Sequence, residues 1–279
     1  MKSVFRSALV ILGLSIAAMS ATAQQRPGEG FTPQVGQAGK DVIWVPTPED
    51  LVERMLRMAQ VTPRDFVVDL GSGDGRIAIA AAKKFQAKSQ GIEFNPDMVG
   101  LSNRNAAREG VAGSVRFVHG DIFAEDFTQA TVVTMYLLPS LNVKLRPKLL
   151  DMKPGTRLVA HQFDMEDWTP DEVDEVDGRR ANLWIVPAKV NGNWRIMMPG
   201  GREQELTLTQ RYQMINGNVR FGKLGAGLRE PLLRGDRISF SVMSPEGNLL
   251  EFTGQVSGDA MEGVVRNGQA TERWSARRG

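Results

Sequence analysis

The sequence predicts an α/β fold, a doubly wound, Rossmann-like sheet of mostly parallel strands, followed by a small all-β barrel or sandwich domain. Two observations carry this prediction. In the first half of the chain, short apolar runs alternate with helical stretches, which is the pattern of βαβ units whose parallel sheet is covered by helices on both faces. In the second half, turn signals recur roughly every 8 to 12 residues between strand-like runs, which is typical of an antiparallel barrel or sandwich.

The chain is predicted to have four parts. Residues 1–23 resemble a secretory signal peptide, with a basic start, an apolar run and Ala21-Thr22-Ala23 before the expected cleavage point. Residues 24–41 are rich in Gly, Gln and Pro and are expected to form a flexible tether. Residues 42–188 make up the α/β domain and residues 189–279 the β-rich domain. We therefore expect export to the bacterial periplasm without stable membrane insertion; an uncleaved N-terminal anchor is the alternative.

Composition excludes several classes of function. The 279 residues include 34 Lys and Arg against 32 Asp and Glu, so the charge balance does not indicate nucleic-acid binding. Cysteine is absent, which excludes disulfides, thiolate metal sites and a cysteine nucleophile. No ligand spacing typical of a metal site is present either, so we expect no bound metal.

The elements of the α/β domain follow one another from Val42 onward. Thr47 is the predicted N-cap of a first helix, and Pro48 is its first residue. Strands are then expected over residues 66–70, 89–93, 115–119, 131–135 and 157–161, and helices over residues 76–85, 96–109 and 140–150. An acidic stretch follows, with one clear strand at residues 183–186, and it is expected to form the closing strands of the same sheet. The β-rich domain has turn signals at Asn191-Gly192, Pro199-Gly200, Asn216-Gly217, Gly225, Gly235-Asp236, Glu246-Gly247, Gly258-Asp259 and Asn267-Gly268.

A glycine-rich loop, GSGDG, follows Asp69 at the end of the first strand. In a doubly wound sheet this place binds a ligand, at the carboxyl ends of the strands and against a helix N-terminus. The dinucleotide fingerprint requires a small residue at position 76, where this chain has Arg76, so a nucleotide-dependent oxidoreductase is disfavoured. Asp69 would repel a pyrophosphate and attract a cation, by ~4 kcal/mol at ~4 Å in an effective dielectric near 20. The loop therefore favours a cationic nucleoside, S-adenosylmethionine (SAM).

Two further acids lie where such a cofactor needs hydrogen-bond acceptors. Glu93 ends the second strand and is placed to accept from both ribose hydroxyls. Asp121 follows the third strand and is placed to accept from the adenine amino group. The predicted cofactor-binding residues are Asp69, Gly71, Ser72, Gly73, Asp74, Glu93, Phe94, Asp121 and Ile122.

The strings DLGSGDGR, GIEFNP and HGDIF, in this order, resemble motif I, the second-strand acid and the third-strand Asp of class I SAM-dependent methyltransferases. The chain is most similar to the small protein-lysine methyltransferases, a group with archaeal broad-specificity enzymes and mitochondrial enzymes that act on ATP synthase. That group carries a similar VPTP…LVERML segment. The resemblance covers about residues 42–167 and implies SAM contacts at Asp69, Gly71, Gly73, Glu93 and Asp121. The signal peptide and the β-rich domain depart from the group's pattern.

The acceptor is expected to meet the segment after the fourth strand. Methyltransferases that modify DNA bases or glutamine have an Asn/Asp-Pro-Pro-aromatic motif there, whereas this chain has Tyr136-Leu137-Leu138-Pro139. With Phe163, these side chains would form an apolar pocket, which favours the neutral form of an amine. Tyr136, which would bind the amine, and His161, which would take its proton, are the candidate catalytic residues. Packing and a purely structural histidine are the alternatives.

Together these patterns predict a SAM-dependent methyltransferase that acts on an amine of a protein or a small molecule, with protein lysine the implied acceptor. Nucleic acid is not an expected partner. The alternative function is that of an exported SAM-fold binding module of the cell envelope that has no turnover.

Overall fold

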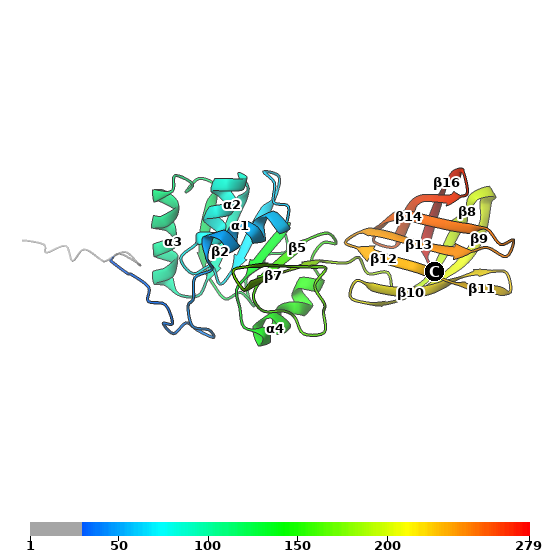
Figure 1. Ribbon diagram of the computed structural model, residues 1–279. Coiled ribbons are helices and arrows are strands. Elements are labelled where there is room, and N and C mark those ends of the chain that lie inside the picture. Colours follow the sequence, from blue (N-terminus) through cyan, green and yellow to red (C-terminus); the bar gives the residue numbers. More distant parts are fainter. Residues whose placement is uncertain (1–29) are drawn as a thin grey trace, which may run out of the picture.

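The computed structural model describes residues 30–279 (Figure 1). The predicted signal peptide and the first residues of the predicted tether lie outside this range, so export stays a prediction. Along the chain an α/β part is followed by a β part, which confirms the predicted order of the two fold types. Across residues 30–279, no helix combines the length and the apolar character that crossing a bilayer requires.

The α/β part contains one seven-stranded sheet, in the order β3-β2-β1-β4-β5-β7-β6. Its elements are α1 (Glu49–Met58), β1 (Phe66–Leu70), α2 (Arg76–Phe85), β2 (Lys88–Glu93), α3 (Pro96–Arg108), β3 (Val115–His119), β4 (Val132–Met135), α4 (Pro139–Leu150), β5 (Arg157–His161), β6 (Glu172–Val176) and β7 (Arg179–Ile185). Strands β1 to β5 pair in parallel, whereas β7 is antiparallel to both of its neighbours. The carboxyl ends of β1 to β5 therefore meet at one edge of the sheet.

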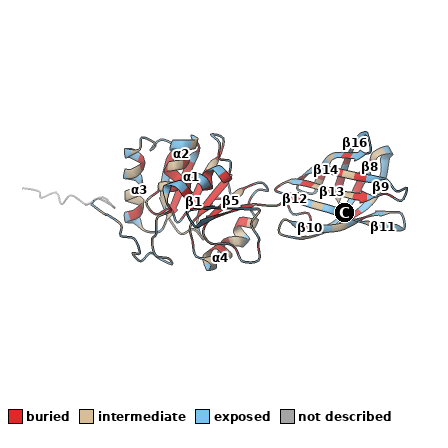
Figure 2. Ribbon diagram, in the orientation of Figure 1, coloured by how far each residue is buried: buried red, intermediate tan, exposed pale blue. Residues whose placement is uncertain are grey.

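Helices cover both faces of this sheet, because successive side chains of its buried strands point in opposite directions. On β1, Val67 packs in one core with Leu51 of α1 and Ile77 of α2. The next residue, Val68, packs in the core on the opposite face with Leu145 of α4. Buried residues accordingly run along the central strands and on the inward sides of the helices (Figure 2).

The acidic stretch after β5 supplies the closing strands of the sheet, as expected, but only one of the two strands was located from the sequence. β7 begins at Arg179, before the expected start at residue 183, and the position of β6 was not predicted. β6 is the edge strand of the sheet and pairs only with β7, and its Val173 is 46% exposed. A charged edge strand lacks the apolar run that marks a buried strand, so the sequence pattern could not reveal it.

The β part is one nine-stranded antiparallel sheet, in the order β11-β10-β9-β8-β16-β15-β14-β13-β12. Its elements are β8 (Gly192–Met198), η1 (Pro199–Gly201), β9 (Arg202–Arg211), β10 (Met214–Phe221), β11 (Leu224–Gly227), β12 (Arg229–Arg234), β13 (Arg237–Met243), β14 (Leu249–Ser257), β15 (Ala260–Asn267) and β16 (Ala270–Arg278). The sheet curls into a nearly closed barrel, which decides between the two predicted alternatives, barrel and sandwich. In its middle, β8 pairs with β16, with Arg195 opposite Arg277.

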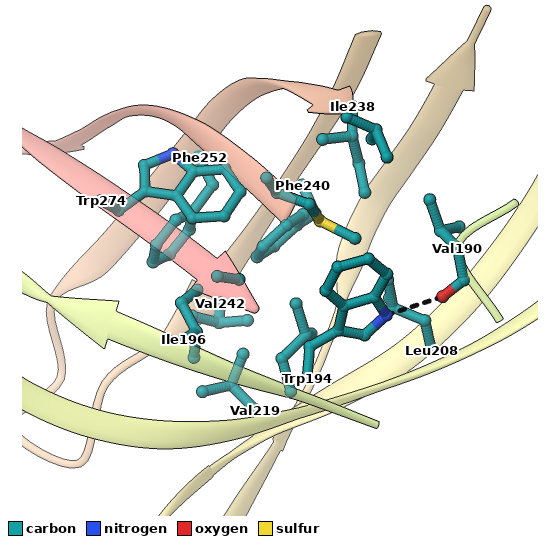
Figure 3. Close-up of a cluster of buried hydrophobic side chains, with 14 of the residues drawn as sticks. Val190, Trp194, Ile196, Leu208, Val219, Ile238, Phe240, Val242, Phe252 and Trp274 are labelled. Atoms are coloured by element: carbon teal, nitrogen blue, oxygen red, sulfur yellow. Dashed lines mark hydrogen bonds between the residues drawn. The ribbon is translucent and has the colours of Figure 1, made fainter. Parts of the chain in front are cut away.

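The curled sheet encloses its own hydrophobic core (Figure 3). Trp194, Phe240, Phe252 and Trp274 are buried in one cluster there. The rings of Phe240 and Phe252 stack with their centroids 4.8 Å apart. Trp194 Nε1 donates a hydrogen bond of 2.8 Å to the Val190 carbonyl, so the indole is buried without an unsatisfied donor. The β part is therefore stabilised by a core separate from those of the α/β sheet.

Two of the predicted turns in the β part are wrong. Gly217 and Gly225 lie inside β10 and β11, and the turns that flank β10 are Tyr212-Gln213 and Gly222-Lys223. A Cβ at Gly217 would lie 2.0 Å from the Thr207 carbonyl oxygen of β9. Glycine is needed at this position because the two strands approach each other closely. In the sequence, such a glycine cannot be distinguished from a glycine in a turn.

Candidate cofactor and acceptor site

A cavity of about 630 Å³ lies at the carboxyl ends of β1, β2 and β4. This volume is typical of sites for small molecules and cofactors. All nine predicted cofactor-binding residues line it, namely Asp69, Gly71, Ser72, Gly73, Asp74, Glu93, Phe94, Asp121 and Ile122. The structure therefore brings together residues that are up to 53 positions apart in sequence, from Asp69 to Ile122, and their contact with SAM stays a prediction.

The glycines of the loop after β1 are required by its shape. Gly71, Gly73 and Gly75 have φ values of +74°, +53° and +83°, in the left-handed region that favours glycine. A Cβ at Gly75 would lie 2.5 Å from Phe117 Cζ, and a Cβ at Gly73 would lie 2.7 Å from Trp44 Nε1. The loop thus turns sharply from β1 into α2 while in close contact with its neighbours.

Asp69 is the buried carboxylate of the site, with 2% of its surface exposed. It accepts a hydrogen bond of 2.7 Å from Thr134 Oγ1 on the adjacent strand β4. Burial raises the pKa of Asp69 to about 7, the Thr134 hydrogen bond opposes this rise, and the nearby carboxylates of Glu93 and Asp74 add to it. Among residues 30–279 no cation pairs with Asp69, so a cationic ligand would supply the missing charge.

Asp74, by contrast, is already neutralised by a neighbour. Arg76 Nη2 lies 2.6 Å from Asp74 Oδ2, and Arg76 Nε also donates to the same carboxylate. The guanidinium donates a further hydrogen bond of 2.9 Å to the Thr47 carbonyl, so it ties the loop to the segment before α1. Asp74 lines the cavity, but its contacts are those of a residue that fixes the loop.

The carboxylate of Glu93 links the loop after β1 to the segment after β2. Oε2 accepts from the Gly73 amide at 2.9 Å, and Oε1 accepts from the Asn95 amide at 2.9 Å. Each oxygen keeps further acceptor capacity, because a carboxylate has about four lone-pair sites. This arrangement is compatible with the predicted ribose contacts.

Residues 34–44 form a strap along the cavity, although residues 24–41 were predicted to be a flexible tether. The Gly36 amide donates to the Trp44 carbonyl at 2.8 Å, and the Trp44 amide donates to the Gln37 carbonyl at 2.9 Å. Residues 37–44 all line the cavity. Sequence could not reveal this segment because it has no apolar periodicity and is held by contacts to distant residues.

Lys40 of the strap contacts two predicted cofactor residues. Its Nζ lies 2.7 Å from Asp121 Oδ2 and 4.5 Å from the centroid of the Phe94 ring. The hydrogen bond from Lys40 lowers the pKa of Asp121, whose carboxylate also accepts from the Phe123 amide. Asp121 was predicted to accept from adenine, whereas in this structure one of its oxygens is held by Lys40. Sequence reasoning missed Lys40 altogether.

The acceptor end of the cavity is apolar. Tyr136, Leu137, Leu138, Leu141 and Phe163 line it, as predicted for four of the five. The rings of Tyr136 and Phe163 are nearly parallel, with centroids 6.1 Å apart and planes 23° apart. These side chains offer few polar partners to an ion, so a neutral amine is favoured here over an ammonium.

His161, the second predicted catalytic residue, is buried behind Tyr136 and does not line the cavity. The two rings are in contact, with centroids 3.7 Å apart. Thr47 Oγ1 lies 3.0 Å from His161 Nδ1, and so the predicted role of Thr47 as N-cap of α1 is wrong. Burial, assisted by Arg179, lowers the pKa of His161 to about 4, which makes it a weak base. These contacts give His161 a supporting position, while a role in proton removal finds no geometric support.

The pKa of Asp69 predicts a pH-dependent affinity for SAM. Binding a cation favours ionised Asp69, so below pH 7 the carboxyl must release a proton when SAM binds. We expect the dissociation constant of SAM to rise by about fivefold from pH 7 to pH 6 and to change by less than about twofold between pH 7 and pH 7.5. Titration calorimetry in buffers of different ionisation enthalpy would measure both affinity and proton release. Equal affinity at pH 6 and pH 7.5, without proton release, would contradict the assignment.

Asp69 also links the stability of the free protein to pH. Its pKa in the folded protein is above its value in the unfolded chain, about 3.9, so folding favours the protonated form. The contribution of this group to stability is therefore present below about pH 4 and is lost as the pH rises to about 7. Bound SAM would offset this loss by pairing with the carboxylate.

Comparison with known proteins gives consistent matches to the α/β part. A family model described as the ANTKMT methyltransferase domain matches residues 69–172. A protein-lysine N-methyltransferase from Saccharolobus islandicus is 46% identical over 143 residues, which cover 50% of this chain and 89% of that protein. A lysine N-methyltransferase of ATP synthase from Homo sapiens is 39% identical over 146 residues, which cover 51% of this chain and 61% of that protein.

Among solved structures, an RNA methyltransferase from Salinibacter ruber in complex with S-adenosyl-L-homocysteine is 48% identical, with a TM-score of 0.52. The match covers 52% of this chain and 96% of that one. The two relatives and the solved structure each match about half of the chain, and the family model, which matches residues 69–172, ends before β8.

Proposed function

Since the chain belongs to the family of protein-lysine methyltransferases matched above, we propose that it transfers the methyl group of SAM to lysine side chains of protein substrates. It is a SAM-dependent enzyme of the transferase class, as its relatives and the S-adenosylhomocysteine-bound structure indicate. The intact set of cavity carboxylates and the adjoining apolar wall favour turnover over the alternative of a binding module without activity.

The observation that carries the proposal is the division of one cavity into two chemically different ends. Near β1 and β2 the cavity has Asp69 and Glu93, carboxylates without a cationic partner among residues 30–279. Beyond β4 it has the apolar wall that contains Tyr136 and Phe163. The first end suits the cationic part of SAM, and the second suits an amine that has lost its proton.

Bound SAM supplies an electrophilic methyl group on its sulfonium. The protein's contribution is mainly to align the acceptor, and good alignment can lower a barrier by ~7 to 11 kcal/mol. Asp69 holds the positive charge at one end, and the wall of Tyr136 and Phe163 orients the amine and excludes water at the other. A lysine with a pKa of about 10.4 needs about 4.6 kcal/mol to lose its proton at pH 7. The apolar wall reduces this cost by disfavouring the charged form.

The proposal predicts where a methyl label appears. The purified protein is incubated with methyl-labelled SAM and a bacterial extract, and mass spectrometry locates the label. We expect methylated lysine in proteins, and far less transfer by the Asp69→Asn variant, which binds SAM more weakly. The Tyr136→Phe variant keeps the ring and should slow transfer, by on the order of tenfold, while SAM affinity is unchanged.

A nuclease-treated sample tests the second acceptor that the comparisons raise. The matched Salinibacter ruber structure is described as an RNA methyltransferase, and label that disappears with nuclease would assign RNA to this chain as well. Label on RNA, on carboxylates or on hydroxyls, with none on lysine, would contradict the proposed acceptor and leave the methyltransferase activity itself in place.

A further inference from the structure

The two parts of the chain are in contact at the turn between β9 and β10. Tyr212 and Gln213 form this turn, because Arg211 pairs with Met214 across it. The Tyr212 ring stacks on Trp168, with centroids 5.6 Å apart and planes within 19°. Its hydroxyl donates to Asp167 Oδ2 at 3.0 Å. The turn therefore holds the loop that follows β5 through both stacking and hydrogen bonding.

The residues on either side of Tyr212 add polar contacts to the same loop. Trp168 Nε1 donates to Gln213 Oε1 at 3.0 Å, and Gln213 Nε2 donates to the Thr169 carbonyl at 2.7 Å. Arg211 Nη2 lies 2.8 Å from Asp167 Oδ2. Trp168 is completely buried, so its indole depends on Gln213 for a hydrogen-bond acceptor.

Helix α4 holds the loop from the other side. Arg146 pairs with Asp167 and donates to the Met165 carbonyl at 2.9 Å. Asn142, which is fully buried, donates through Nδ2 to the carbonyls of Phe163 at 3.3 Å and Asp164 at 3.1 Å. Residues 163–169 are thus clamped between α4 and the β part.

Phe163 connects this clamp to the active site. It is the first residue of the clamped loop, and its ring lines the acceptor end of the cavity opposite Tyr136. No residue beyond Phe163 lines the cavity in the described part of the chain, so this loop is the segment through which the β9–β10 turn reaches the acceptor wall.

The backbone on both sides of the contact adopts a conformation that side chains rarely adopt. Tyr212 has a φ of +54°, and Gln162 and Glu166 in the loop have φ values of +64° and +57°. Residues with side chains persist in this region when their surroundings hold them there. A tyrosine where glycine would be unstrained indicates that the position requires the ring and its contacts.

We propose that the β9–β10 turn is a positioning element of the acceptor site. It fixes residues 163–169 and thereby keeps Phe163 in the wall that receives the amine. Tyr212 is its central residue, supported by Arg211 and Gln213. The β part thereby controls methyl transfer to the acceptor without affecting SAM binding. This inference rests on the proposed function only for the identity of the acceptor.

Tyr212→Gly is the variant that tests the proposal, because glycine is unstrained at this φ and the turn should still form. With poly-L-lysine as acceptor, kcat/KM should fall by about tenfold to a hundredfold, since a shift of the wall misaligns the amine. The dissociation constant of SAM should stay within about twofold. Tyr212→Phe, which keeps the stacking on Trp168, should restore most of the wild-type rate.

Lys189→Ala is the matched control. It removes another ion pair between the two parts, Lys189 with Asp151, which does not touch residues 163–169. Wild-type kcat/KM is expected for this variant. If Tyr212→Gly also retains wild-type kcat/KM, or loses SAM affinity in proportion, the positioning role is wrong.

Hydrogen–deuterium exchange of the full chain gives a second readout that needs no acceptor. Amides of residues 162–169 should exchange faster in Tyr212→Gly than in wild type or Lys189→Ala, whereas the loop of residues 69–75 should not change. Unchanged exchange over residues 162–169 would overturn the proposal. If wild type transfers no methyl to poly-L-lysine, the proposed acceptor is at fault, and the exchange experiment still decides whether the turn positions the loop.

Discussion

Replacing Asp69 by Asn should lower the affinity for SAM by a factor of about 10² to 10³. The variant loses one negative charge at a buried site, and a charge pair at ~4 Å is worth ~4 kcal/mol in an effective dielectric near 20. Asn keeps the shape and an oxygen that accepts from Thr134, so the effect reports mainly the charge. Titration calorimetry with SAM and with S-adenosylhomocysteine at pH 7.5 measures it, after circular dichroism has shown that the variant is folded.

Asp74→Asn provides the matched control for this experiment. It removes an equal charge from the same loop, but from a carboxylate that Arg76 already neutralises. We expect a loss of affinity below about tenfold. Equal losses in the two variants would mean that only the net charge of the loop matters, and the assignment of Asp69 to the cofactor's cation would be wrong.

The rate of methyl transfer to lysine should rise steeply with pH. At saturating SAM, kcat/KM for the acceptor reports the ionisations of the free acceptor and of the SAM-bound enzyme. Only the neutral amine reacts, and its fraction rises about tenfold per pH unit below a pKa of about 10.4. We therefore expect an increase of about a hundredfold from pH 7 to pH 9, measured with poly-L-lysine and labelled SAM.

Neither His161 nor Asp69 can produce this rise. The pKa of His161 is about 4, below the range, and Asp69 is held ionised by the bound cation. A rate that is flat from pH 7 to pH 9 would show that the protein removes the proton itself. That result would require a base that the apolar wall does not contain among its lining residues.

Sequence reasoning succeeded best for the cofactor end of the cavity, for a topological reason. Asp69, Glu93 and Asp121 follow successive parallel strands, and the carboxyl ends of such strands meet at one edge of the sheet. The positions of β1, β4 and β5 were predictable because these strands are buried and mostly apolar in sequence. In this half of the chain, the strands predicted from the sequence are therefore also the ones whose ends form the site.

Two features that sequence could not predict depend on a distant partner. Thr47 has the sequence signature of an N-cap, but its hydroxyl is within hydrogen-bond distance of His161, far along the chain. Lys40 lies in a stretch without periodicity and is placed by Asp121 and Phe94. Such residues give no local signal, because the contact that gives them a role forms only when the sheet and the strap come together.

The turn at Tyr212 was missed because it lacks the residues by which turns are recognised in a sequence. A turn is predicted where glycine or asparagine occurs, and the strongest such pair nearby, Asn216-Gly217, lies inside a strand. Tyr212 does not suit the local backbone, where its φ is positive, but it suits the surface of Trp168 on which its ring stacks. Local rules fail at such positions, which are therefore worth examining for function.

The pairing of β8 with β16 determines when the barrel is able to assemble during synthesis. Arg195 lies opposite Arg277, so the first strand of the β part to leave the ribosome waits for the last one before that edge is covered. Pairings across such a long stretch of chain form slowly, because the loop-closure entropy must be overcome before the contact forms. All strands of the methyltransferase half have been synthesised by then, so that half can fold first. During this interval the open edges of the nascent β strands are exposed to other chains, which makes the β part the one most in need of chaperones.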